Sequence, residues 1–327
     1  MVGKIRFMKN IFTITVLFST LAMCIDSLAQ NTVQKAEKGT ETVAAKSELR
    51  ELYPRKGKYF VYWGYNRAAY SPSTIEFKEG WYDFTIHDVR ATDAPTNPNS
   101  QYYGLTTFTI PQFNVRVGYY LNDKNFISFG FDHMRYTMSK QSARLSGHIN
   151  TGANAGTYNN TEVVVGEDAE VANSGESIIE KLPGGFVTNY EHCDGLNDFT
   201  FEAGHLEQIW ISKNRKHALC VVGTAGIGGV ITDTDADVLG MAPRHDMEGN
   251  KKAYHLAGYS FCTSMGLQFD FCKRGFFLFK VKAGYMNLPD IFTTMEGGRA
   301  SQHFTYIEPM GVFGYNFALK KHKKQQA

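Results

Sequence analysis

The chain has 327 residues, of which 43% are hydrophobic, 14% are aromatic and 20% are charged. A disordered protein has fewer hydrophobic residues and a larger net charge, so we expect a folded chain. The formal net charge is only +2, which lacks the basic excess of nucleic-acid-binding proteins. The composition therefore excludes a disordered chain and predicts no nucleic-acid partner.

The first thirty residues have the pattern of an export signal. Three basic residues precede an apolar stretch, Ile11 to Met23, and the small residues Ser27 and Ala29 stand where a signal peptidase would cut. The apolar stretch is shorter than the roughly 20 residues of a membrane-spanning helix. We therefore predict a cleaved signal peptide over residues 1–30, followed by a flexible periplasmic segment over residues 31–56.

Eight segments of the remaining chain alternate apolar and polar residues with the period of a β-strand. Short connections follow the second, fourth and sixth segments, and much longer ones follow the first, third, fifth and seventh. This alternation is typical of outer-membrane barrels, which have short periplasmic turns and long extracellular loops. The segments cover residues 58–66, 107–121, 125–138, 198–212, 217–232, 253–272, 275–288 and 302–319.

We therefore predict an all-β fold, namely an eight-stranded antiparallel transmembrane β-barrel over residues 57–320. Residues 321–327 would form a basic periplasmic tail. The predicted sixth and seventh strands show the two faces, because Phe269 and Phe279 alternate with Gln268 and Lys280. In a barrel the apolar face meets lipid and the polar face lines the interior.

The charged residues assigned to the interior nearly balance in sign, which predicts an internal network of salt bridges. A barrel of eight strands is narrow enough to be filled by its own side chains, so an open pore is disfavoured. The alternative is a gated ion path. The predicted network consists of Arg116, Asp132, Asp270, Lys280, Lys282 and Glu308.

The fourth predicted strand does not keep the pattern. If Phe201 and Ala203 face lipid, then His205 and Glu207 face it too. A β-bulge near Gly204 would reset the phase, and this is the explanation that we favour. The alternative is that His205 and Glu207 lie near the membrane interface.

Two long connections carry further expectations. The first contains the sequence TIEFKEGWYDFTIHDVRA, which predicts a hairpin that extends the first two strands. The connection over residues 139–197 is rich in Gly, Asn and Ser and is predicted to be mobile. Cys220 and Cys272 would lie at the same end of neighbouring strands, so that either a disulfide or two free thiols fits the pattern.

Three histidines are weak candidates for catalysis of the kind found in small lipid A-modifying barrels: His133, His205 and His255. Their possible partners are Asp132 for the first, Glu202 or Glu207 for the second and Ser260 for the third. Asp132 and His133 are adjacent, so on a strand they point to opposite faces. No catalytic residue is predicted beyond these weak candidates.

A calcium site is a weak alternative in the sequence TDTDADVLG. Asp233, Asp235 and Asp237 have the odd spacing of a calcium loop. Val238 stands where such a loop needs glycine, and a bidentate glutamate is missing downstream. We therefore predict no cofactor, with Ca²⁺ as the alternative.

Two stretches resemble a family of outer-membrane β-barrel proteins of Bacteroidota. They are YFVYWGYNRAAYSPSTIEFKEGWYDFTIHDVRATDAP and IPQFNVRVGYYLNDKNFISFGFDHMRYTM, and the resemblance extends over about residues 58–319. It implies an outer-membrane location and a barrel fold, and it adds no chemistry. The chain departs from outer-membrane barrels in general, which end on an aromatic residue, because ALKKHKKQQA follows Phe317.

The sequence thus predicts an integral protein of the outer membrane with a structural or surface-interaction role through its long loops. A lipid-modifying outer-membrane enzyme is the alternative, and a small-solute channel is the third. The expected partners are outer-membrane lipid and a glycan or protein ligand at the extracellular loops. The oligomeric state is left open.

Overall fold

The computed structural model describes residues 51–94, 112–166, 185–241 and 254–319. The predicted signal peptide, most of the predicted flexible segment and the basic tail lie outside these residues. In the described part of the chain every regular element is a β-strand. No helix there is long and apolar enough to cross a membrane.

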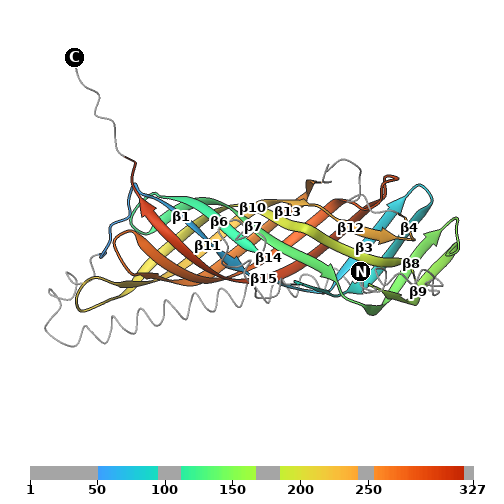
Figure 1. The fold of residues 1–327 in the computed structure, drawn as a ribbon, viewed down its shortest axis with the longest axis horizontal. Coiled ribbons are helices and arrows are strands. Elements are labelled where there is room, and N and C mark those ends of the chain that lie inside the picture. Colours follow the sequence, from blue (N-terminus) through green and yellow to red (C-terminus); the bar gives the residue numbers. More distant parts are fainter. Residues whose placement is uncertain (1–50, 95–111, 167–184, 242–253, 320–327) are drawn as a thin grey trace, which may run out of the picture. The chain divides into compact units, whose positions relative to one another are not determined.

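Eight antiparallel strands form a closed ring (Figure 1). Each strand pairs with the next one, and the last strand, β15, pairs again with β1. The prediction of an antiparallel all-β fold is confirmed, and each predicted segment contains one ring strand or most of one. In ring order these are β1 (Tyr59–Asn66), β6 (Phe113–Tyr120), β7 (Asn125–Met138), β10 (Val187–Ile211), β11 (Ala218–Thr232), β13 (His255–Asp270), β14 (Gly275–Phe292) and β15 (Arg299–Phe317).

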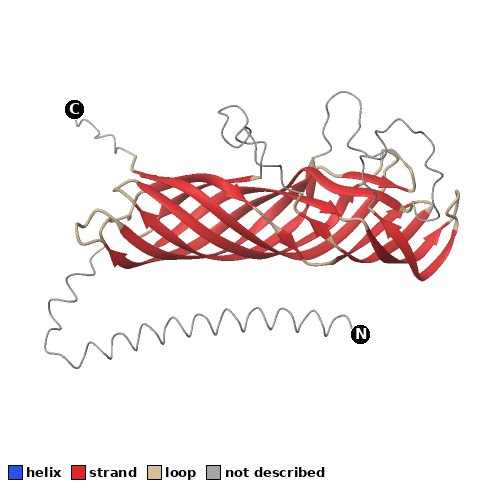
Figure 2. Ribbon diagram, turned by 60° about the horizontal axis from the view of Figure 1, so that its bottom comes forward, coloured by secondary structure: helices blue, strands red, loops and turns tan. Residues whose placement is uncertain are grey.

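The two ends of the ring differ. Short connections join β6 to β7, β10 to β11 and β13 to β14 at one end, which we call the turn end. At the opposite end, the extended end, further strands continue the sheet from β15 (Figures 1 and 2). In sheet order these are β3 (Ser73–Glu79), β4 (Tyr82–Val89), β8 (Gln141–Ile149) and β9 (Gly156–Val165).

Both predictions about the long connections need correction. The predicted hairpin forms as β3 and β4, but it pairs with β15 and β8 instead of extending the first two ring strands. Within the connection predicted to be mobile, residues 141–165 form the β8–β9 hairpin, and residues 167–184 lie outside the described residues. The hairpin's alternate residues Ala143, Leu145 and Val163 are buried, and this burial orders the hairpin. Three short strands, β2 (Ala69–Tyr70), β5 (Ala91–Thr92) and β12 (Asp235–Val238), pair with β15, β7 and β10.

The predicted bulge near Gly204 is wrong. The pairing of β10 with β7 and β11 runs through Gly204 without a shift, and the irregularity with β11 lies between Gln208 and Trp210. His205 and Glu207 therefore stay on the outer face, where their side chains are 56% and 48% exposed. His205 lies opposite Asn125, the first residue of β7, so both side chains are close to the turn end.

The outside of the ring is an apolar belt. Its side chains alternate along every ring strand with buried ones, and each is at least 36% exposed. A continuous exposed patch of this kind is unfavourable in water. The residues of this outer belt are Val61, Val115, Val117, Phe129, Phe201, Ile227, Tyr259, Phe261, Leu267, Phe269, Phe277, Phe279, Val281, Ile307, Phe313 and Tyr315.

The inside of the ring is layered. At the turn end it holds an apolar cluster, which the sequence analysis did not anticipate: Phe60, Tyr62, Tyr120, Phe126, Leu206, Cys220, Val222, Phe276, Leu278 and Val312. At the extended end a larger apolar core includes Phe77, Phe84, Tyr136 and Phe304. Cys220 is buried, Cys272 is exposed and both are free thiols, so no disulfide joins them. Polar residues fill the space between the two apolar clusters.

Candidate functional site

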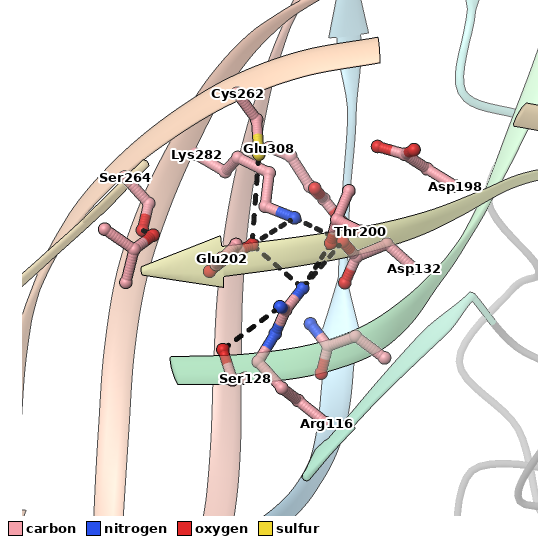
Figure 3. A network of polar contacts seen from close by, with 12 residues as sticks. Arg116, Ser128, Asp132, Asp198, Thr200, Glu202, Cys262, Ser264, Lys282 and Glu308 are labelled. Carbon is pink, nitrogen blue, oxygen red and sulfur yellow. Dashed lines mark hydrogen bonds and ion pairs between the residues drawn. The ribbon is translucent and has the colours of Figure 1, made fainter. Parts of the chain in front are cut away.

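The candidate site is a layer of buried charges inside the ring (Figure 3). We call it the ionic layer, and each of its members is at most 2% exposed. Successive side chains of a strand point to opposite faces. Each member therefore projects into the ring, because the residues before and after it on the same strand face outward. The ionic layer consists of Arg116 on β6, Asp132 on β7, Asp198 and Glu202 on β10, Lys280 and Lys282 on β14, and Glu308 on β15.

Glu202 is the centre of the layer, because three cations contact it. Arg116 Nη2 lies 2.8 Å from Glu202 Oε1, Lys282 Nζ lies 3.1 Å from the same oxygen, and Lys280 Nζ lies 3.4 Å from Oε2. Figure 3 shows Arg116 and Lys282 reaching it from opposite sides. Such a cluster compensates the desolvation of its members only when all of them are paired.

Asp132 is the second carboxylate that binds cations. Lys282 Nζ forms an ion pair with Asp132 Oδ2, and Arg116 Nη2 lies 3.6 Å from the same oxygen. The guanidinium of Arg116 also donates to Thr200 Oγ1 at 2.6 Å. The predicted residues Arg116, Asp132, Lys280 and Lys282 therefore meet in one network through Glu202.

Sequence reasoning missed the role of Glu202, which it considered only as a partner of His205. The signal was present, because Phe201 and Ala203 on the outer face place Glu202 on the inner one. The structure shows Glu202 0% exposed inside the ring, whereas His205 lies on the outside. If the alternation had been continued along this strand without a bulge, it would have predicted that Glu202 faces the interior.

Asp198 and Glu308 belong to the layer without an ion pair within 4.0 Å among the described residues. Asp198 accepts hydrogen bonds from Ser260 Oγ at 2.6 Å and from the Tyr306 hydroxyl at 3.3 Å. Glu308 Oε1 accepts one from Asn66 Nδ2 at 2.5 Å. Figure 3 accordingly draws no dashed line between either carboxyl group and a lysine or arginine.

Asp270 is separate from the ionic layer, which corrects the prediction of one network. Its partner is Arg55 Nη2, and Gln268 Nε2 also donates to it at 2.8 Å. The Arg55 and Asp270 side chains are each 2% exposed. Lys280 contacts Glu202 instead, because it lies opposite Gly266, whereas Asp270 lies opposite Phe276 at the turn end.

Arg55 reaches Asp270 from the segment just before β1, which we call the strap (residues 52–57). The strap lies across the turn end, where Leu52 N donates to Gln208 Oε1 at 2.9 Å and Arg55 N donates to Asp123 Oδ1 at 2.6 Å. The backbone N–H groups of Lys56 and Arg55 hold the pKa of Asp123 below its ordinary value. This part of the segment predicted to be flexible is thus held in place.

Glycines make room for the buried cations. A Cβ atom at Gly130 would lie 2.6 Å from Arg116 Cζ, and one at Gly266 would lie 2.4 Å from Lys280 Cβ. Real Cβ atoms do not approach so closely, so both side chains can lie flat against the neighbouring strand only where that strand has glycine. The ring can hold the ionic layer because these two positions lack side chains.

A small cavity lies between the ionic layer and the turn-end apolar cluster. Arg116, Glu202 and Lys280 line one side of it, and Phe60 and Phe276 line the other. It has the size of an ordered water molecule and the polar wall that such a water needs. It is too small for a solute, and apolar side chains separate it from the turn end.

The three candidate histidines lie apart from one another. His133 is on the outer face, where Nδ1 is 2.8 Å from Asn197 Oδ1, whereas its possible partner Asp132 is inside. His205 lies 3.4 Å from Glu207 near the turn end. His255 stacks on Phe292 at the extended end, with the ring centroids 3.8 Å apart. Its possible partner, Ser260, points inward to Asp198. His133 and His255 thus point away from the partners suggested by the sequence, and His205 lies beside Glu207 on the outer face.

The three aspartates of the possible calcium loop do not converge. Asp235 and Asp237 share one face of β12 and are partly exposed, whereas Asp233 precedes the strand and is buried. Asp237 Oδ2 accepts a hydrogen bond from Thr188 Oγ1 at 2.7 Å. In the part of the chain that the structure describes, no three histidine, cysteine, aspartate or glutamate residues form a cluster that could hold a metal ion.

Comparisons with known proteins return outer-membrane proteins among solved structures. OprG from Pseudomonas aeruginosa is 10% identical, with a TM-score of 0.34, over 83% of this chain and 100% of that one. Ail of Yersinia pestis is 12% identical, with a TM-score of 0.26, over 80% and 99%. Neisserial surface protein A is 6% identical, with a TM-score of 0.30, over 81% and 98%. The chain is similar to outer-membrane β-barrel proteins at this low level.

No family model and no curated protein matches the chain. The resemblance to the Bacteroidota family therefore stays a prediction.

Proposed function

We propose that the protein is an integral outer-membrane β-barrel that does not conduct and that anchors an ordered β-structure at the cell surface. The ring is the membrane-spanning part, with its turn end in the periplasm and its extended end outside the cell. The observation that carries this proposal is the filled interior. The ionic layer lies between two apolar clusters, and its members are almost completely excluded from solvent.

The outer belt supports the membrane location. On β13 it runs from Tyr259 to Phe269. With the rise of a tilted strand this distance is about 25 Å, which equals the height of the apolar band of outer-membrane barrels. Beyond the belt the outer face becomes polar, and Arg135 forms an ion pair with Glu191 at 3.1 Å. Lipid would therefore cover the belt and leave this polar end in water.

The interior argues against a channel. A conducting barrel needs a hydrated path whose charges are screened by water. Here Arg116, Lys280 and Lys282 contact carboxylates directly and are at most 2% exposed. Apolar side chains close both sides of the layer, and Arg55 closes the turn end further. The third alternative, a small-solute channel, is the one that this geometry disfavours.

The extended end offers a rigid polar surface. The inner faces of β3 and β4 carry Phe77 and Phe84, which are 0% exposed and stack with their ring centroids 5.2 Å apart. Their outer faces carry polar residues such as Lys78 and Asp83, which form an exposed ion pair. A polar surface held by its own core suits a glycan or protein ligand better than lipid. Surface interaction is the role that we propose for it.

A planar-bilayer measurement tests the closed interior. The purified protein, refolded in detergent and added to the bilayer, should give no reproducible conductance steps, while a porin added to the same bilayers provides the positive control. Steps whose ion selectivity changes in Lys280→Gln would contradict a closed barrel and favour the channel. Recovery of the protein in the soluble periplasmic fraction of cells would contradict the membrane location.

A further inference from the structure

The interior of the ring holds one more carboxyl group than it holds cations. Asp93 and Asp233 are also buried, but they lie outside the ring strands. Among the described residues, the charged side chains buried inside the ring are the cations Arg55, Arg116, Lys280 and Lys282 and the carboxyl groups Asp132, Asp198, Glu202, Asp270 and Glu308.

The cation contacts are distributed unevenly over these carboxyl groups. Asp270 has Arg55, and Asp132 and Glu202 share the remaining three cations. Asp198 and Glu308 have no cation within 4.0 Å among the described residues. If both were ionised, the ionic layer would carry four negative and three positive charges shielded from bulk solvent. A buried charge without compensation is so unfavourable that such a group binds a proton instead.

The hydrogen bonds of Asp198 and Glu308 indicate which of the two carboxyl groups binds the proton. Asp198 receives two hydroxyl donors, from Ser260 and Tyr306, so its carboxylate form is well satisfied. Glu308 is 0% exposed, and among the described residues it receives only the amide of Asn66 and its Oε2 atom has no hydrogen-bond partner. A carboxylate that accepts a single hydrogen bond in a dry interior is the less stable of the two.

We propose that Glu308 is a proton-binding site, so that the ionic layer contains one carboxylic acid and is electrically neutral. The proton sits on Oε2, the atom that has no other partner. Two amide oxygens inside the ring, those of Asn66 on β1 and Asn114 on β6, also have no hydrogen-bond partner among the described residues, so this part of the interior lacks donors. Neutrality then follows without a bound metal ion.

The titratable groups around Glu308 come from six of the ring strands, β6, β7, β10, β13, β14 and β15 itself. Asp132 and Asp198 lie opposite each other across the β7–β10 pair. Two carboxyl groups are therefore neighbours in the ionic layer even without Glu308. Lys282 lies directly opposite Glu308 across the β14–β15 pair. The titratable or charged groups that face Glu308 within the ring are Arg116, Asp132, Asp198, Glu202, Cys262, Lys280, Lys282 and Tyr306.

The site links folding to pH in a defined direction. The folded protein holds one proton on Glu308 near neutral pH, and the unfolded chain, with an ordinary glutamate, holds none. The folded state thus binds more protons than the unfolded state, so its stability falls as pH rises through the titration of Glu308. A glutamine at this position mimics the protonated acid and removes the dependence.

Infrared spectroscopy of the unmodified protein tests for the acid. The folded barrel in detergent at neutral pH should show the carbonyl-stretch band of a protonated carboxylic acid. Uniform ¹³C labelling of glutamate should shift that band, and ¹³C labelling of aspartate should not. A band that moves only with the aspartate label would place the proton on an aspartate instead of Glu308, and the absence of any band would show that all carboxyl groups are ionised. Either result overturns the proposal.

Thermal unfolding of two matched variants gives a second readout. Glu308→Gln should keep the unfolding midpoint near that of the unmodified protein at neutral pH and should lose less stability at alkaline pH. Glu202→Gln, which removes a carboxylate that three cations contact, should lower the midpoint clearly. Equal losses in the two variants would overturn the proposal. So would a midpoint of the unmodified protein that depends on Na⁺ at constant ionic strength, because a cation would then replace the proton.

Discussion

At the scale of single residues, burial inside the ring and in the extended-end core sets which side chains carry charge. Glu202 tolerates burial because three cations contact it. His192 on β10 represents the opposite case. It is 0% exposed, Nδ1 lies 2.8 Å from Thr234 Oγ1, and burial lowers its pKa to about 3. It lies opposite Tyr136, beyond the outer belt. His192 must therefore be neutral in the folded protein.

His192 should make the protein sensitive to acid. Its pKa is lower in the folded protein than in the unfolded chain, where it is about 6.5. Its contribution to stability is complete above pH of about 6.5 and is lost as pH falls toward 3. By a pH of about 4.5 this loss amounts to roughly 2–3 kcal/mol. His192→Gln should therefore flatten the decline of the thermal midpoint over this window.

The control for this measurement is His148→Gln, because His148 on β8 is exposed. Its pH profile should follow that of the unmodified protein. If the His192→Gln profile follows it as well, then His192 is not held neutral by burial. Aspartates and glutamates titrate in the same window in all three proteins, so the comparison isolates the histidine.

At the scale of elements, the strap shows how a short segment completes the interior. Residues 52–57 have no strand of their own, yet their backbone N–H groups bind Asp123 and Gln208, and Arg55 enters the ring to meet Asp270. The turn-end apolar cluster lies directly inside this contact. The strap thus neutralises Asp270, the carboxylate buried beside the turn-end apolar cluster.

Replacing Arg55 by methionine should destabilise the barrel more than replacing both members of its ion pair. Arg55→Met leaves Asp270 buried and unpaired, which costs roughly 3–5 kcal/mol, whereas Arg55→Met with Asp270→Asn leaves no charge behind. Thermal unfolding in detergent measures both variants. Lys78→Met is the matched control on an exposed ion pair and should cost at most about 1 kcal/mol. A double variant as unstable as the single one would mean that the two residues do not act as a pair.

At the scale of the whole molecule, closure of the ring separates an outer face, which needs an apolar surrounding, from an interior, which needs its charges to be paired. All ring strands are paired on both sides, so the eight strands of the ring have no free edge. The outer belt then needs an apolar solvent, and the interior needs complete pairing of its charges. In a membrane both requirements are met by the same alternation of residues.

Assembly should depend on where along one outer face a charge is placed. Phe279 and Asn287 are both on the outer face of β14, but Phe279 lies within the outer belt and Asn287 lies at its edge, opposite Tyr259. An arginine in the middle of the lipid costs roughly 2–4 kcal/mol and near the interface about 0–1 kcal/mol. Phe279→Arg should reduce the folded fraction, seen as the faster band of unheated samples on a denaturing gel, and Asn287→Arg should not. Equal folded fractions would show that the belt is not in lipid.

The sequence alone determined the ring strands and their two faces, because a strand alternates its side chains whatever its partners are. Arg116, Asp132, Lys280 and Lys282 were recognised as interior residues in this way, and all four are buried. The tertiary structure alone decided which charges meet. Arg55 reaches Asp270 from far along the chain, and Glu202 joins strands β6 and β14 from β10. Such pairings depend on register and on closure of the ring, which the period of a single strand does not encode.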